Sequence, residues 1–214
     1  MTDRYVRWRD RKTAEQCVKQ LRGRGYDAAL ALSVNAAQSM ILKMVTDYET
    51  FGFGGSMTTR AMGLIVELRI MGKTVYDHWD KTLSAESVAE TRKRQGRCDC
   101  FLCSANAITV DGEIVNIDGI GNRASAMMFG PRKVIVVAGV NKIARNLPDA
   151  LARAKNVAAP IRAKSLGCDT PCAETGFCTD CRSPRRICCI TTIFHQRPQQ
   201  TDMSVILINE DMGY

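Results

Sequence analysis

Two glycine-rich turns carry the residues of this sequence whose types and spacing best suit the binding of a small anion. Glycines let a backbone approach a ligand closely, and hydroxyl, amide and guanidinium groups donate hydrogen bonds to carboxylate or phosphate oxygens. The first turn, GFGGSMTT over residues 52–59, supplies the candidate ligand-binding residues Gly54, Gly55, Ser56 and Thr58. The second turn, NIDGIGNR over residues 116–123, supplies Asn116, Gly119, Asn122 and Arg123.

Asp118 is the candidate acid-base group between the two turns. It either acts as a general base or orients Arg123, whose guanidinium suits bidentate contact with a carboxylate or phosphate. A structural role is the alternative, because Ser56 or Thr58 can cap the helix after the first turn and Asp118 the helix after the second. The first turn lacks the lysine of a Walker loop and the GxGxxG spacing, so it predicts neither ATP nor a dinucleotide.

The segment 168–189 is the third candidate, because it is rich in cysteine and in turn-forming residues. Four thiolates from such a segment can hold zinc tetrahedrally or ligate an iron-sulfur cluster. The predicted ligands are four of these five residues: Cys168, Cys172, Cys178, Cys181 and Cys188. Only Cys178 and Cys181 have CxxC spacing, so free or redox-paired thiols are the alternative. Cys188 precedes the strand-like ICCITTI and suits the core as well as a ligand role.

Strands and helices alternate along the chain and must position these residues. Helical spacing or composition favours helices at 12–23, about 35–45, 61–72, 84–96, 123–129 and 147–164. Apolar extended runs favour strands within 26–32, 49–53, 73–79, 98–110, 133–140, 187–196 and 204–210, and Asp111-Gly112 predicts a tight hairpin. We therefore expect a mostly parallel α/β sheet with helices on both faces, the hairpin and the cysteine-rich segment being insertions. Ligands of such sheets collect at the carboxyl ends of the strands.

The block SANAITVDGEIVNIDGIGNRASAMMFGPRKVIVVAGVNKIARNLPDALARAKNVAAP, residues 104–160, resembles the signature of the lactate-utilisation (LUD) domain family. GFGGSMTTRAMGL before this block, and SPRRICCITTI and VILINEDMGY after it, stand in the family's order. The resemblance implies the three-layer α/β fold of the sugar-phosphate isomerase and CoA-transferase-like superfamily, with ligands at the first glycine-rich turn. It also implies a role in the oxidation of lactate to pyruvate beside other subunits of iron-sulfur systems. The chain lacks the CxxCxxCxxxCP arrangement of electron-carrying components and so resembles a small stand-alone member.

Composition sets limits on the class of protein. The 214 residues, of which 45% are hydrophobic, suffice for one domain spanning residues 1–214. No apolar run is long enough to span a membrane and the charged start does not read as a secretory signal, so we expect a cytoplasmic protein. The net charge of +8 is scattered and has few aromatic companions, which disfavours nucleic acid as a partner.

Three functions are compatible with these features. The first is a component of lactate or related organic-acid utilisation that binds a small carboxylate or phosphate metabolite between the two turns. The second is an iron-sulfur or zinc-binding subunit for redox sensing or electron transfer, organised by the cysteine-rich segment. The third is an enzyme of the isomerase or CoA-transferase type with Asp118 as its base. His78 and His195 are not expected to be catalytic, because neither lies in a repeated metal-ligand spacing.

Overall fold

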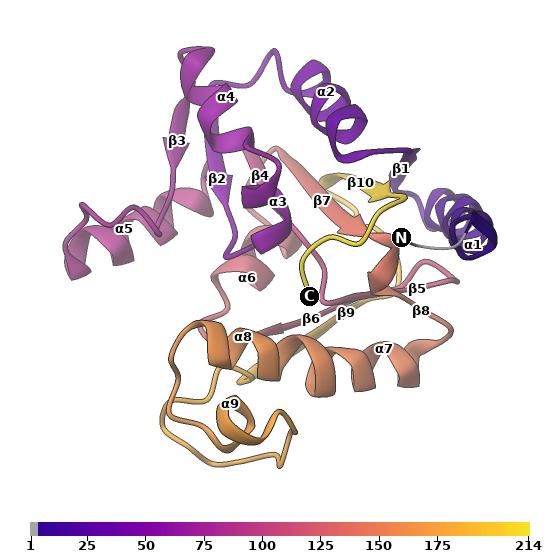
Figure 1. Ribbon diagram of the computed structural model, residues 1–214. Coiled ribbons are helices and arrows are strands. Elements are labelled where there is room, and N and C mark those ends of the chain that lie inside the picture. The colour runs from indigo at the N-terminus through magenta and orange to yellow at the C-terminus, as the bar shows by residue number, and fades with distance from the viewer. Residues whose placement is uncertain (1–3) are drawn as a thin grey trace.

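The computed structural model describes residues 4–214, and its larger sheet consists of six parallel strands in the order β1-β10-β7-β4-β2-β3 (Figure 1). These strands are β1 (Asp27–Ala31), β10 (Asp202–Ile208), β7 (Lys133–Gly139), β4 (Cys100–Cys103), β2 (Thr50–Phe53) and β3 (Thr74–Tyr76). The central strands are apolar on both faces, as expected for a sheet that is covered on both sides.

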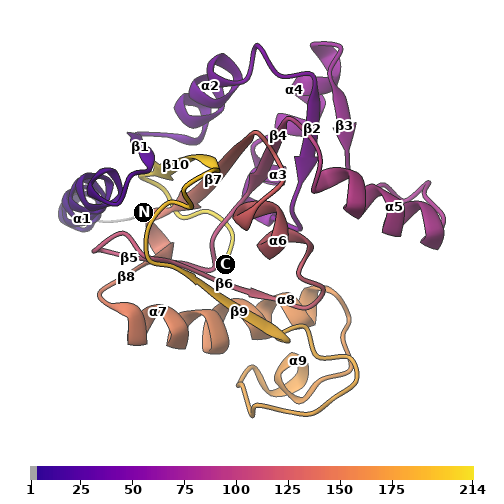
Figure 2. The same cartoon turned by 180° about the vertical axis from the view of Figure 1, so that it is seen from behind.

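Helices cover both faces of this sheet, which confirms the predicted α/β class. One face carries α1 (Arg4–Gly23), α5 (Ala85–Gln95) and α6 (Asn122–Met128), and the other carries α2 (Val34–Met44), α3 (Met57–Ala61) and α4 (Leu64–Ile70) (Figures 1 and 2). Side chains of β10 alternate between the two cores: Val205 and Leu207 pack with α1, whereas Ile206 and Ile208 pack with α2 and α4. The helix predicted over 61–72 is interrupted at Gly63, which has a φ of 68°.

The predicted hairpin is confirmed, but it belongs to a second sheet rather than standing alone. β5 (Ala107–Thr109) and β6 (Ile114–Asp118) are antiparallel and are joined through Gly112, whose φ is 89°. They are flanked by β8 (Ile143–Ala144) and β9 (Ile190–Phe194), in the order β8-β5-β6-β9. Ile108 and Ile114 face the larger sheet's core, whereas Val115 and Ile117 face the opposite way.

A long helical segment covers that outer face of the second sheet. It runs from α7 (Leu147–Arg153) through a π-helical turn (Ala154–Ala158) into α8 (Ala159–Ser165). The π turn ends two residues before Pro160, which cannot donate a backbone hydrogen bond, so the change of helical pattern lies close to the residue that interrupts the bonding. The short α9 (Pro171–Thr175) follows in the cysteine-rich segment. Among residues 4–214, no helix is both long and apolar enough to cross a membrane.

Candidate functional site

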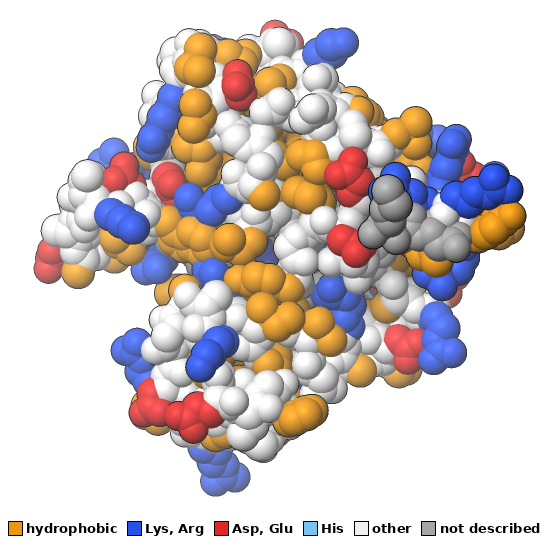
Figure 3. All heavy atoms as spheres, viewed as in Figure 1, with side chains coloured by type: hydrophobic (Ala, Val, Ile, Leu, Met, Phe, Trp, Pro, Cys, Tyr) orange, Lys and Arg blue, Asp and Glu red, His pale blue; other side chains and the backbone are white. Residues whose placement is uncertain are grey.

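The two glycine-rich turns border one cavity of about 240 Å³, at the carboxyl ends of β2 and β6. Its lining includes Gly55, Ser56 and Thr58 of the first turn and Asp118, Gly119, Asn122 and Arg123 of the second. The cavity faces the end of the larger sheet at which ligands of α/β proteins bind. Met57, Ile120 and Leu166 line it and are exposed; in Figure 3, hydrophobic side chains border the hollow between the upper and lower parts of the molecule.

Gly54 and Asn116, the other two predicted residues, lie behind the cavity wall. A Cβ atom on Gly54 would lie 3.2 Å from the Cβ atom of Cys103, so the site demands glycine for close packing against β4. Asn116 is buried, and its Oδ1 accepts a hydrogen bond of 3.2 Å from the backbone amide of Asn106. Both residues support the turns without reaching the cavity.

The first turn is shaped by a helix cap and by a close contact with Trp79. The Ser56 hydroxyl accepts a 3.1 Å hydrogen bond from the Thr59 amide, which caps α3. A Cβ atom on Gly55 would lie 3.2 Å from Cζ2 of Trp79, so glycine lets the indole cover the turn. Thr58 donates a 3.2 Å hydrogen bond to the Met212 carbonyl, which ties the segment after β10 to the site.

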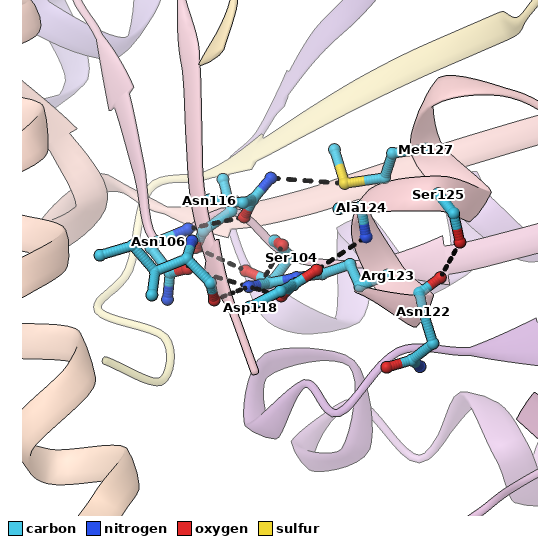
Figure 4. A network of polar contacts seen from close by, with 11 residues as sticks. Ser104, Asn106, Asn116, Asp118, Asn122, Arg123, Ala124, Ser125 and Met127 are labelled. Atoms are coloured by element: carbon cyan, nitrogen blue, oxygen red, sulfur yellow. Dashed lines mark hydrogen bonds and ion pairs between the residues drawn. The ribbon is translucent and has the colours of Figure 1, made fainter. Parts of the chain in front are cut away.

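Asp118 and Arg123 form the centre of a polar network under the second turn (Figure 4). Oδ1 of Asp118 accepts hydrogen bonds from Nε and Nη2 of Arg123, at 2.8 and 2.6 Å, and Oδ2 accepts one of 2.7 Å from the Ala124 amide. Arg123 also donates to the carbonyls of Ser104 and Ile117 and to Oδ1 of Asn106. Asp118 therefore has the geometry of a residue that orients Arg123 and caps α6, because the carboxylate and the guanidinium are both largely engaged with protein atoms.

Lys142 is a functional candidate that the sequence did not single out. It directly follows β7 in a 3₁₀ turn (Val140–Lys142), is only 2% exposed and lines the cavity. Its Nζ donates to the hydroxyls of Thr58, at 3.0 Å, and Ser104, at 2.9 Å. Burial, and then the nearby charges of Arg153 and Arg123, lower the pKa of Lys142 to about 7. A lysine just beyond the carboxyl end of an apolar strand was the only signal in the sequence.

An aromatic and cationic wall lies opposite. The guanidiniums of Arg60 and Arg162 lie over the Trp79 ring, with Cζ atoms 4.0 and 4.3 Å from its centroid. His78 also lines the cavity, with Nδ1 2.9 Å from Nε2 of Gln95. Burial, followed by the charge of Arg92, lowers the pKa of His78 to about 4, so its imidazole is neutral at pH 7. No metal-ligand pattern surrounds His78 in the sequence, and its place in the cavity follows from the fold alone.

The predicted cysteine ligands do not form a metal site as they are placed. Cys168, Cys172, Cys178, Cys181 and Cys188 are half-buried free thiols. Over residues 4–214, no three histidine, cysteine, aspartate or glutamate side chains come together as a metal site requires. Metal ligation by four of these five cysteines therefore stays a prediction, and no step of the proposed function runs through a metal. Cys98, Cys100 and Cys103, by contrast, are buried in the core.

The family follows from comparison of the whole chain with known proteins. The model of the LUD domain matches residues 14–208, which include both turns, Lys142 and the cysteine-rich segment. The chain belongs to the LUD domain family. A DUF162 family protein from Deinococcus radiodurans is similar to this LUD domain in fold, with a TM-score of 0.56 at 16% identity over 93% of this chain and 98% of that chain.

A second solved structure is similar only weakly. It is eIF2B beta from Chaetomium thermophilum, with a TM-score of 0.31 at 17% identity over 65% of this chain and 44% of that chain. This likeness is too low to define a shared fold. This chain matches none of the curated proteins with which it was compared.

Proposed function

We propose that this LUD domain takes part in the utilisation of lactate or a related organic acid, beside other subunits of that process, by binding a small carboxylate between its two glycine-rich turns. Membership of the LUD family supports the metabolic role. The observation that carries the binding role is the charge of the cavity: Arg92 and Arg162 both line it, and neither has a carboxylate within ion-pair distance among residues 4–214.

The carboxylate that lines the cavity already has a cationic partner. Asp118 is the acidic residue that lines the cavity, and its charge is matched by Arg123 at 2.6 Å. Nε of Arg92 is buried and has no hydrogen-bond partner within the described chain, so one donor of this arginine is unsatisfied. Unpaired buried donors are costly, so a carboxylate that binds the Arg92 guanidinium would offset part of that cost.

The size of the cavity favours a small metabolite. About 240 Å³ is less than the roughly 300–1,000 Å³ that is typical of pockets for drug-sized ligands. A three-carbon acid fits such a space, whereas a CoA ester would have to extend past the exposed rim at Met57, Ile120 and Leu166. The apolar rim and the cationic interior together suit a short carbon chain with one carboxylate.

Binding can be followed by the fluorescence of Trp79, because Arg162 lies on its ring. Trp8, the other tryptophan of the chain, is exposed and is replaced with Phe to leave Trp79 as the reporter. Lactate, pyruvate, inorganic phosphate, a sugar phosphate and a CoA ester are titrated, and thermal stability is measured in parallel, because a ligand of the folded state raises it. We expect lactate or pyruvate to produce saturable changes in both signals.

Arg162→Gln and Arg92→Gln should each weaken this binding by about tenfold or more, because each substitution removes one charge-assisted hydrogen bond to the carboxylate. Arg94→Gln is the matched control, because Arg94 lies on α5 with Arg92 but is exposed and pairs with Glu90. Selective binding of the sugar phosphate or the CoA ester would instead support an isomerase- or transferase-type enzyme. Equal loss in all three variants would contradict the assigned site.

A further inference from the structure

Lys142 and Lys133 are both buried, but their surroundings differ. Nζ of Lys133 lies 2.9 Å from a carboxylate oxygen of Asp202, an ordinary ion pair at the start of β7. Nζ of Lys142, at the other end of β7, meets only the hydroxyls of Thr58 and Ser104 among the described side chains. A buried amine without a counter-charge is expensive to keep protonated, and such amines are the ones that proteins use as nucleophiles.

We propose that Lys142 forms a reversible imine with the carbonyl carbon of a small 2-oxo acid bound in the cavity. The inference rests on the proposed function, since the 2-oxo acid is the oxidised form of the hydroxy acid that the cavity would accommodate. Three features of the site support it: Lys142 lines the cavity, two hydroxyls contact its amine, and Arg92 and Arg162 line the cavity without a carboxylate partner among residues 4–214.

The electrostatic surroundings supply the neutral amine that the reaction needs. Burial is the first cause that disfavours the ammonium form of Lys142, and the charges of Arg153 on α7 and Arg123 on α6 add to it. The nearby thiol of Cys103 on β4 is uncharged at neutral pH, because burial raises its pKa to about 12. Because the pKa of Lys142 is about 7, a large fraction of the side chain is unprotonated at neutral pH. An exposed lysine, with its pKa near 10.4, is almost entirely protonated there.

The reaction is balanced without an oxidant or a reductant. The lone pair of the Lys142 nitrogen attacks the carbonyl carbon, and a proton passes from that nitrogen to the carbonyl oxygen, giving a carbinolamine. The second proton of the nitrogen then passes to the hydroxyl of this intermediate, which leaves as water while the C=N bond forms. The hydroxyls of Ser104 and Thr58 contact Nζ directly and are placed to relay both protons. Lactate has no carbonyl group and can bind only non-covalently.

Reductive trapping tests the imine directly. The full-length protein is incubated with pyruvate and then with borohydride, and its intact mass and its peptide map are measured. We expect one adduct per chain, equal to pyruvic acid less one oxygen atom, located on Lys142. The yield should exceed that on Lys133 by at least about tenfold, because the Lys133 amine is paired with the Asp202 carboxylate. Trapping should increase as the pH rises through about 7.

Lactate with borohydride and Lys142→Met with pyruvate are the negative controls, and neither should give the adduct. Should the Met variant not fold, the peptide map of the wild-type protein still decides the site. Adducts spread over many lysines, or as abundant on Lys133, would overturn the proposal. Saturable binding of pyruvate without any adduct would overturn the imine and leave the proposed function intact. Absence of binding by both lactate and pyruvate would refute the proposed function as well.

Discussion

Replacing Lys142 with Met should stabilise the LUD domain below pH 7, although it removes the side chain to which we assign the chemistry. The pKa of Lys142 falls from its ordinary value of 10.5 to about 7, first because of burial and then because of repulsion by Arg153 and Arg123. Each pKa unit corresponds to about 1.4 kcal/mol. The buried ammonium therefore lowers the free energy of unfolding by roughly 5 kcal/mol below pH 7.

The lost hydrogen bonds of Lys142 offset part of this gain, by about 1–3 kcal/mol. The offset is modest because the Thr58 hydroxyl still donates to the Met212 carbonyl, at 3.2 Å, and the Ser104 hydroxyl to the Ala105 carbonyl, at 3.3 Å. We expect a net gain of roughly 2–4 kcal/mol in the free energy of unfolding near pH 6. A stabilising substitution at a buried polar position is typical of residues that are kept for function.

The pH dependence of the gain identifies its cause. Between about pH 7 and 10.5 the unfolded lysine holds a proton that the folded one has released, so the wild-type protein gains stability as the pH rises, whereas Met has no such proton. Urea unfolding of both proteins, followed by circular dichroism at about pH 6 and about pH 9, should show the gap narrowing by about 2–3 kcal/mol. A gap that does not change with pH, or a Met variant less stable at pH 6, would refute this reasoning.

Three further predictions concern the walls of the cavity and the cysteine-rich segment. Arg123→Ala should lower the free energy of unfolding by about 3–5 kcal/mol in urea titrations, because it leaves the Asp118 carboxylate buried without its cation; a loss below about 1 kcal/mol would contradict a buried pair. Gly55→Val should displace Trp79 and weaken pyruvate binding by about tenfold with an unchanged circular dichroism spectrum. Gly23→Ala is the control and should leave pyruvate binding unchanged, because there is open space around Gly23. If the cysteines ligate a metal, protein purified without oxygen will contain iron and sulfide, or zinc, and Cys178→Ser will lose it; metal-free folded protein would exclude that ligation.

Much of the site was predictable because its residues are close in sequence. The first turn follows β2 of the larger parallel sheet, so its place at the ligand-binding edge follows from local patterns. The second turn follows β6 of the other sheet, so its convergence on the same cavity depends on how the two sheets pack together. The pairing of Asp118 with Arg123 is similarly local, because the two residues flank the turn before α6. The sequence alone leaves the role of Asp118 open between general base and orienting group. The orienting role is favoured by contacts that only the fold creates, above all those of its partner Arg123 with the carbonyls of Ser104 and Ile117.

The parts that sequence reasoning missed depend on contacts between distant segments. Lys142 looks like a surface cation after a strand, and its burial arises from Thr58 and Ser104, which lie 84 and 38 residues away in the chain. The strand predicted around residue 190 was correct, but its partner β6 could not be inferred, so the second sheet was unforeseen. The two-residue strand β8 is too short to produce any alternation.

The position of β10 between β1 and β7 has a consequence for how the protein folds as it is synthesised. β1 pairs only with β10 within the described chain, and the Ser204 hydroxyl contacts the Asp27 carboxylate across a separation of 177 residues. While a ribosome is still making the intervening chain, β1 has no neighbour, and the apolar edge of β7 that β10 will occupy stays open. Early pairing is therefore restricted to the β7-β4-β2-β3 part of the larger sheet and to strands such as the β5-β6 hairpin. The larger sheet is complete only when β10, the last of its strands to be made, inserts between β1 and β7. Such pairing of distant segments favours slow folding.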